Sequence, residues 1–188
     1  MNSLIRTMIA RLRGDRRGLG AVEFALIAPF LILLYLGGYQ LMDATSAYRK
    51  VTTTTRTLAD VTSQFTSVQS ADLDNIMGAA ASVMTPYPAS NATTRISEIA
   101  ISAAGMPSVV WSRANTGPLL KTTDLYTSTL PNSVVPLQLR VPGTNLIYAE
   151  VTYAYSPVAG GQLIGPMSFR DQIFMNPRRS TDIPCTGC

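Results

Sequence analysis

Residues 16–42 of this chain have the sequence RRGLGAVEFALIAPFLILLYLGGYQLM, in which two arginines, a short glycine-containing stretch and one glutamate precede a long apolar run. The 19 positions from Phe24 to Met42 carry no charged residue. At roughly 1.5 Å of rise per residue they form a helix of about 28 Å, close to the hydrocarbon thickness of a bilayer. The run therefore predicts a membrane-spanning helix, with Glu23 where the membrane begins.

The basic character of the chain is confined to the residues before Gly18. The formal net charge is +4 over 188 residues, and five arginines against Asp15 supply all of it within residues 1–17. The rest of the chain nets to zero, so it has no surplus cationic face to neutralise phosphates, which argues against nucleic-acid binding. The five arginines are Arg6, Arg11, Arg13, Arg16 and Arg17.

Histidine is absent from the sequence. This removes the usual general base at neutral pH and the commonest metal ligand. We therefore expect a protein that is not an enzyme, with no catalytic residue, no cofactor and no metal site. The length leaves room for one membrane segment and one domain of ordinary size.

Three interpretations of the N-terminus compete. A secretory signal peptide would be cut near Ala44-Thr45-Ser46, but the apolar run exceeds the about 7–15 residues of such a peptide and the helical pattern continues beyond it. An uncleaved anchor explains the arginines, which hold the N-terminus in the cytoplasm. It leaves Glu23 without a purpose, although an ionisable group at a membrane edge is a functional candidate. The third interpretation is a leader removed after Gly18.

The spacing of Gly18, four further residues and then Glu23-Phe24 resembles the processing motif of type IV prepilins of the tight-adherence (Flp/Tad) class. Residues 20–31, GAVEFALIAPFL, are similar to the N-terminal signature of TadE-like pseudopilins, including the proline. Flp major pilins usually carry tyrosine after the glutamate, so Phe24 favours the TadE branch. The resemblance implies that a membrane aspartic peptidase, the prepilin peptidase, cuts between Gly18 and Leu19 on the cytoplasmic side.

The resemblance also implies a function and a location. The chain would be a structural minor pseudopilin that helps to assemble a tight-adherence pilus, with other pilins, pseudopilins, the assembly platform and membrane lipid as partners. It would cross the bacterial inner membrane once, with a cytoplasmic N-terminus and a periplasmic domain, and it would be open to incorporation into an extracellular pilus. The alternative is an uncleaved single-pass envelope protein that binds another exported protein.

Glu23 has two interpretations that stay open. In assembled pilins of the broader family, the glutamate at the fifth mature position is thought to pair with the N-terminal amine of a neighbouring subunit, here the amine of Leu19. A buried charge pair of this kind makes assembly register-specific. Alternatively, Glu23 lies at the headgroup level and is solvated.

Pro29 removes a backbone donor and disfavours the helical conformation of the residue before it, which predicts a kink in the membrane helix. A tolerated membrane proline is the alternative. Gly37 and Gly38 would allow close helix packing but lack the spacing of a small-xxx-small motif.

Beyond the span, a stripe at intervals of three and four residues predicts that the helix continues over residues 43–68. The stripe fits packing against the chain's own domain, with a coiled-coil seam as the alternative. The β-branched residues at 52–55 mark either a flexible joint or a polar face. A second helix is expected over 70–84, ended by Pro86. The stripe comprises Leu41, Ala44, Tyr48, Val51, Thr55, Leu58, Val61, Phe65 and Val68.

After residue 93 the pattern changes to short β-branched and aromatic runs, which predict strands at 94–102, 108–112, 134–141, 145–156 and 169–175. Residues 119–126 fit a short helix or a loop equally well. Core packing is the expected role of Tyr148, Tyr153 and Tyr155.

The expected fold class is α+β and pilin-like, with a long N-terminal helix packed on a small antiparallel sheet. The expected divisions are a leader (1–18), a membrane helix (19–42), its continuation (43–68) and a periplasmic domain (69–188).

Cys185 and Cys188 are the two cysteines of the sequence. A zinc site would need two further ligands, and a thioredoxin-like centre should begin a helix within a βαβ unit. We expect a small exposed disulfide formed after export, with free thiols as the alternative.

Overall fold

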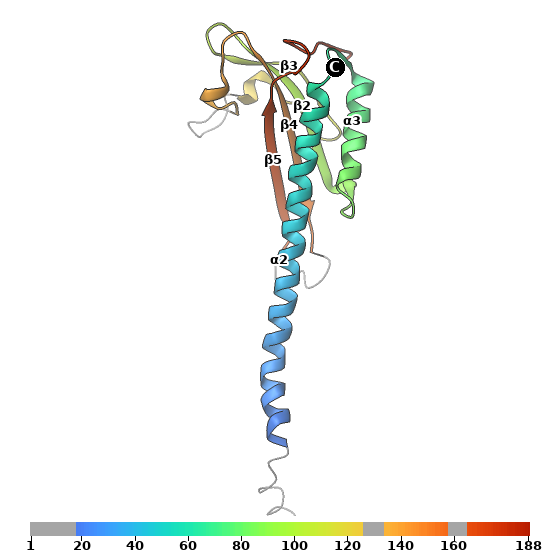
Figure 1. Cartoon of the computed structure of the whole chain (residues 1–188), viewed down its shortest axis with the longest axis vertical. Helices are drawn as coiled ribbons and strands as arrows, with labels where there is room; N and C mark the ends of the chain where they lie inside the picture. The colour runs from blue at the N-terminus through green and yellow to red at the C-terminus, as the bar shows by residue number, and fades with distance from the viewer. Residues whose placement is uncertain (1–17, 126–133, 158–164) are drawn as a thin grey trace, which may run out of the picture.

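The computed structural model describes residues 18–125, 134–157 and 165–188. The basic residues before Gly18 lie outside this part of the chain. The α+β prediction is confirmed, because a long N-terminal apolar helix is combined with a small antiparallel sheet of four strands (Figure 1). The main elements are α2 (Leu19–Ser63), β1 (Val68–Gln69), α3 (Ser70–Val83), β2 (Ala92–Ile101), β3 (Pro107–Ala114), β4 (Asn145–Tyr155), β5 (Met167–Met175) and β6 (Cys185–Thr186).

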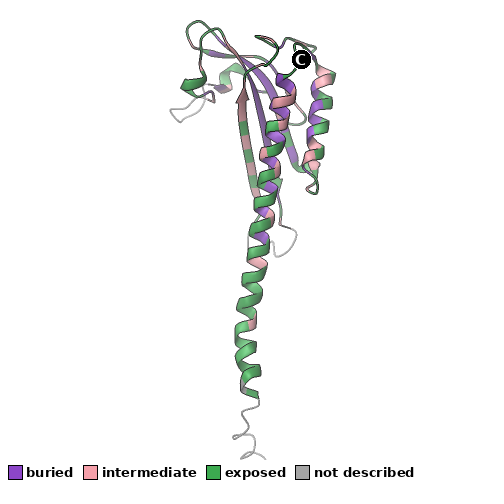
Figure 2. Cartoon of the chain, viewed as in Figure 1, coloured by how far each residue is buried: buried purple, intermediate pink, exposed green. Residues whose placement is uncertain are grey.

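Helix α2 is 45 residues long, which corresponds to about 68 Å. Its first half stands clear of the domain and is almost entirely exposed, whereas its second half packs on the sheet (Figure 2). The packed face is formed mainly by alanine, valine, leucine and threonine, whose small side chains let the helix lie close to the strands. Buried there are Ala44, Ala47, Val51, Thr54, Thr55, Leu58 and Ala59.

The threonines at 52–55 do not interrupt α2. Thr54 and Thr55 are buried, and their hydroxyls donate to the carbonyl oxygens of Lys50 and Val51 at 2.8 and 2.9 Å. This local bonding satisfies each hydroxyl inside the core without a partner from the sheet. Thr54 and Thr55 therefore belong to the packed face, and α2 has no joint at residues 52–55.

The prediction that the helix extends to Val68 is wrong, because α2 ends at Ser63. Val68 is buried through a different contact: its N–H donates to the carbonyl of Pro184 at 3.0 Å, and β1 pairs in parallel with β6. The spacing of three and four residues in the apolar stripe thus extends to Val68 by coincidence, because the chain leaves the helix after Ser63. Helix α3 begins two residues later, where Gln69 and Asp72 form a capping box.

The sheet has the strand order β3-β2-β4-β5, and neighbouring strands are antiparallel. Helix α2 lies over β4 and β5, and α3 lies beside α2 (Figure 1). A core between helices and sheet includes Ile96, Ile147 and Val151. Tyr148, Tyr153 and Tyr155 are buried as predicted.

The opposite face of the sheet is covered at one end by a second apolar cluster that includes Ile99, Leu125 and Tyr148. The strand predicted at 134–141 is wrong. Val135 is buried in this cluster, and the next element is a single 3-10 turn, Leu137–Leu139, that starts after Pro136. Within 119–126 the structure has another 3-10 turn, Thr122–Leu125, and Tyr126 lies outside the described residues.

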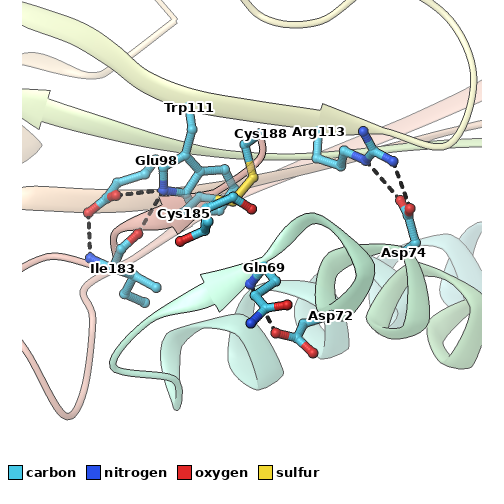
Figure 3. The surroundings of a disulfide bond; sticks show 10 residues. Gln69, Asp72, Asp74, Glu98, Trp111, Arg113, Ile183, Cys185 and Cys188 are labelled. Atoms are coloured by element: carbon cyan, nitrogen blue, oxygen red, sulfur yellow. Dashed lines mark hydrogen bonds and ion pairs between the residues drawn. A yellow bond between two sulfur atoms is a disulfide. The ribbon is translucent and has the colours of Figure 1, made fainter.

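Residues 176–188, here called the C-terminal strap, close the end of the domain that lies far from the start of α2 (Figure 1). The strap begins at the end of α2, where the Arg178 N–H donates to the Ser63 carbonyl at 2.8 Å. Further on, the Ile183 N–H donates to Glu98 at 2.9 Å and the Ile183 carbonyl accepts from the Trp111 indole at 2.8 Å. The strap therefore joins α2 to β2 and β3, and Figure 3 shows Ile183 of the strap beside Glu98 and Trp111.

Candidate membrane anchor and processing segment

The predicted cleavage site lies at the beginning of α2. The helix starts at Leu19, and Gly18 is its N-cap residue without a side-chain capping bond. A Cβ atom at Gly18 or Gly20 would meet no atom of the described residues within 4 Å, so packing within this part of the chain does not require glycine at either position. Residues 19 and 23 are four positions apart in one helix, which places them on the same side, one turn from each other.

The side chains of Glu23 and Phe24 are exposed, Phe24 to 67%. The residues that follow have the same character, and the helix is long and apolar enough to cross a membrane. So large a continuous apolar surface marks a membrane or protein contact rather than a surface adapted to water. Each of the following is at least half exposed: Val22, Phe24, Leu26, Ile27, Phe30, Leu31, Ile32, Leu33, Leu34, Tyr35, Tyr39, Leu41 and Met42.

Pro29 lies within α2, and the helix continues through it without interruption. Neither Gly37 nor Gly38 would bring a Cβ atom within 4 Å of another residue. These positions thus have no packing role in the described part of the chain, and a functional kink at Pro29 stays a prediction.

Asp43 joins the apolar half of α2 to the domain. The hydroxyl of Tyr87 donates to its Oδ1 atom at 2.9 Å, and the hydroxyl of Tyr155 donates to its Oδ2 atom at 2.6 Å. Tyr87 lies between α3 and β2, and Tyr155 ends β4, so one carboxylate ties the helix to two other parts of the fold. The sequence analysis did not select Asp43, although it is the first charged residue after the apolar run.

The contacts of Asp43 with Tyr87 and Tyr155 predict that the stability of the fold decreases at alkaline pH. Burial, followed by the hydrogen bond to Asp43, raises the pKa of Tyr87 from 10.0 to about 12, and the same causes raise the pKa of Tyr155. Because the folded state favours the neutral hydroxyl, this contribution to stability is complete below pH 10 and is lost as the pH rises toward 12. We expect tyrosinate absorbance of the full chain in detergent micelles to show this late titration, and Asp43→Asn to move it to lower pH. An unchanged titration in Asp43→Asn would mean that the carboxylate makes no contribution.

Cys185 and Cys188 form a disulfide in the strap. Figure 3 shows this disulfide. Cys185 is half-buried and pairs with Val68 across β1 and β6, and Cys188 is exposed. The bridge closes a very short loop, which restricts little unfolded-chain entropy, so its contribution to stability is small.

The described residues contain no group of three or more histidine, cysteine, aspartate or glutamate side chains placed to hold a metal ion. A cavity of about 180 Å³ on the outer face of the sheet is lined by Thr93, Arg95, Thr116, Pro118, Glu150 and Thr152. Its two charged side chains already form an ion pair with each other. We assign no catalytic role to this cavity.

Comparison with known proteins gives one result for the N-terminal part of the chain. Residues 18–60 match the family model described as TadE-like protein. Neither the curated proteins nor the solved structures contain a match to this chain. The matched segment begins at Gly18, includes Glu23 and the apolar run, and ends three residues before the end of α2. The resemblance predicted from Gly18, Glu23-Phe24 and residues 20–31 is thereby confirmed: residues 18–60 of this chain are similar to the TadE-like family.

Proposed function

We propose that this chain is a minor pseudopilin of a tight-adherence pilus, anchored in the inner membrane by the first half of α2 and exposing its α+β domain to the periplasm. The proposal rests on one observation: the segment that matches the TadE-like family lies within a single helix, α2, whose two halves have different surroundings. The first half of that helix presents apolar side chains outward, and the second half is part of the domain core. A subunit of this shape has a structural role.

The position of Asp43 argues against a secretory signal peptide cut after Ser46. Such a cut would remove Asp43 and leave the hydroxyls of Tyr87 and Tyr155 without their acceptor. It would also remove Ala44, which is 6% exposed in the core. The cut would thus take away part of the packed face of α2, so the domain is better preserved when α2 stays whole.

Removal of the leader after Gly18 suits the exposed beginning of α2. The cut would remove the segment that carries the net charge of +4 and create a cationic amine at Leu19. That amine and the Glu23 carboxylate, which is exposed in the single chain, would both lie at the membrane edge. We propose that they pair between neighbouring subunits and that the partners of this chain are the prepilin peptidase, other pilins and the assembly platform.

The cleavage proposal predicts the mature mass. In cells with a working prepilin peptidase, we expect intact-mass measurement and N-terminal sequencing to give a chain that starts at Leu19. Deletion of the peptidase should restore the leader without changing the amount of protein in the membrane. A Met1 start in the presence of the peptidase would instead support the uncleaved anchor that binds another exported protein, and an Ala47 start would support a signal peptide.

A further inference from the structure

The two cysteines of the disulfide in the C-terminal strap have different surroundings. Cys185 is half-buried, packs against the core between helices and sheet, and pairs with the buried Val68. Cys188 is exposed, and so are Thr186 and Gly187 within the bridged loop. Thiol–disulfide exchange requires access to the sulfur that is attacked. A thiol from another molecule therefore reaches Cys188 more readily than Cys185.

The hydrogen bonds that hold the strap on the domain are made by residues that precede the bridge. The Arg178 N–H donates to the end of α2, and the side chain of Ile183 is fully buried between its hydrogen-bond partners in the sheet (Figure 3). The Pro184 carbonyl accepts from the Val68 N–H at 3.0 Å. The bridge links two residues three positions apart, beyond these contacts. Breaking it therefore removes none of them and releases little chain entropy.

We propose that the Cys185–Cys188 disulfide is a site of thiol–disulfide exchange, at which a protein dithiol reduces the bridge by attack at Cys188 while the domain stays folded. The partner is a dithiol for a chemical reason. After attack by a single thiol, the released Cys185 thiol lies three residues from the mixed disulfide and re-forms the bridge. A second thiol on the partner completes the reduction instead. The inference goes beyond the proposed structural role and uses only contacts within the domain.

The exchange has two steps. In the first, one thiol of the partner loses its proton and attacks the Cys188 sulfur, which forms a mixed disulfide and breaks the bond to Cys185. The electron pair of that bond goes to the Cys185 sulfur, which takes up a proton. In the second, the other partner thiol loses its proton and attacks the partner sulfur of the mixed disulfide, so that Cys188 leaves and is protonated. The partner is thereby oxidised from dithiol to disulfide, and this chain gains two electrons and two protons.

The test uses the full-length, unmodified protein in detergent micelles without denaturant. One sample receives dithiothreitol, a small dithiol, and another receives reduced thioredoxin as the protein dithiol. Free thiols are counted from the mass added by N-ethylmaleimide. The fluorescence of Trp111 reports on the fold, because its indole donates to the Ile183 carbonyl of the strap at 2.8 Å.

We expect both reagents to expose the two thiols of the chain while the fluorescence of Trp111 stays unchanged. Thiols that appear only when denaturant is added would show that the bridge is closed to exchange in the folded domain. Reduction by dithiothreitol and not by thioredoxin would overturn the protein dithiol as partner. A change in Trp111 fluorescence on reduction would mean that the bridge holds the strap in place, which contradicts exchange in a folded domain.

Single-cysteine variants identify the sulfur that is attacked. Cys185→Ser leaves Cys188 as the free thiol and Cys188→Ser leaves Cys185, and both variants lack the bridge, so each is the matched control of the other. We expect N-ethylmaleimide to modify Cys188 at least about tenfold faster than Cys185, since the reactivity of a thiol follows its exposure. Equal rates, or faster modification of Cys185, would overturn attack at Cys188. Trp111 fluorescence checks the fold of both variants, and the experiment on the unmodified chain does not depend on them.

Discussion

Glu23→Ala is expected to leave membrane insertion and leader removal unchanged and to reduce incorporation into pili by roughly a hundredfold or more. Removing one member of a buried charge pair costs about 3–5 kcal/mol, and each 1.4 kcal/mol is about tenfold in an association equilibrium. In the single chain Glu23 is exposed, and it lies at one end of the apolar half of α2. The loss should therefore fall on contacts between subunits rather than on the fold.

The measurement is the amount of the variant in sheared pili relative to the amount in the membrane. N-terminal sequencing of the membrane fraction establishes that processing is intact, so that a defect of the peptidase is not mistaken for a defect of assembly. Glu23→Gln is the matched control for size: it should resemble the alanine variant if the charge is essential. Incorporation of Glu23→Ala at the wild-type level would mean that Glu23 is solvated at the headgroups and pairs with nothing.

The second large effect is expected at Glu98, which is fully buried. Its Oε1 atom accepts from the Asn145 amide at 2.8 Å and from the Ile183 N–H at 2.9 Å, and its Oε2 atom accepts from the Trp111 indole at 2.7 Å. Glu98→Ala leaves the amide of Asn145 and the N–H of Ile183 without these bonds and also creates a cavity. We expect the free energy of unfolding to fall by about 3–5 kcal/mol.

Denaturant unfolding of the full chain in detergent micelles measures this loss, with the fluorescence of Trp111 as the probe beside the affected site. Glu98→Gln is the matched control. Its carbonyl oxygen still accepts two hydrogen bonds, and the Trp111 indole keeps the Ile183 carbonyl at 2.8 Å. The glutamine variant should therefore lose clearly less stability than the alanine variant. Equal stability of Glu98→Ala and the wild type would mean that the C-terminal strap is held by its other contacts.

The long apolar helix could be predicted from the sequence because its signals are local. The uncharged run from Phe24 to Met42 and the Glu23 spacing are complete within about 25 residues, so neither depends on the rest of the fold. The clearest strand pattern, at 145–156, also corresponds to β4 within one residue. Ile147 and Val151 of this strand lie in the core between helices and sheet.

Contacts between distant residues could not be predicted in the same way. Asp43 meets Tyr155 across 112 positions and Tyr87 across 44, and no spacing rule links residues so far apart. Val68 continued the helical stripe and is indeed buried, but its partner is Cys185 in β6. The run at 134–141 had strand-forming residues, yet Pro136 lacks a donor for a ladder and the chain there covers the sheet instead of joining it.

The place of the strap in the sequence constrains how the domain is completed. The last strand of the four-stranded sheet, β5, is followed by the strap that supplies β6. Without Ile183 and Cys185, the side chains of Glu98 and Trp111 and the backbone of Val68 lack these partners. A chain truncated before residue 176 would therefore keep all four strands of the sheet and still leave the buried Glu98 and Trp111 without their contacts to Ile183, so the strap completes the core of the domain.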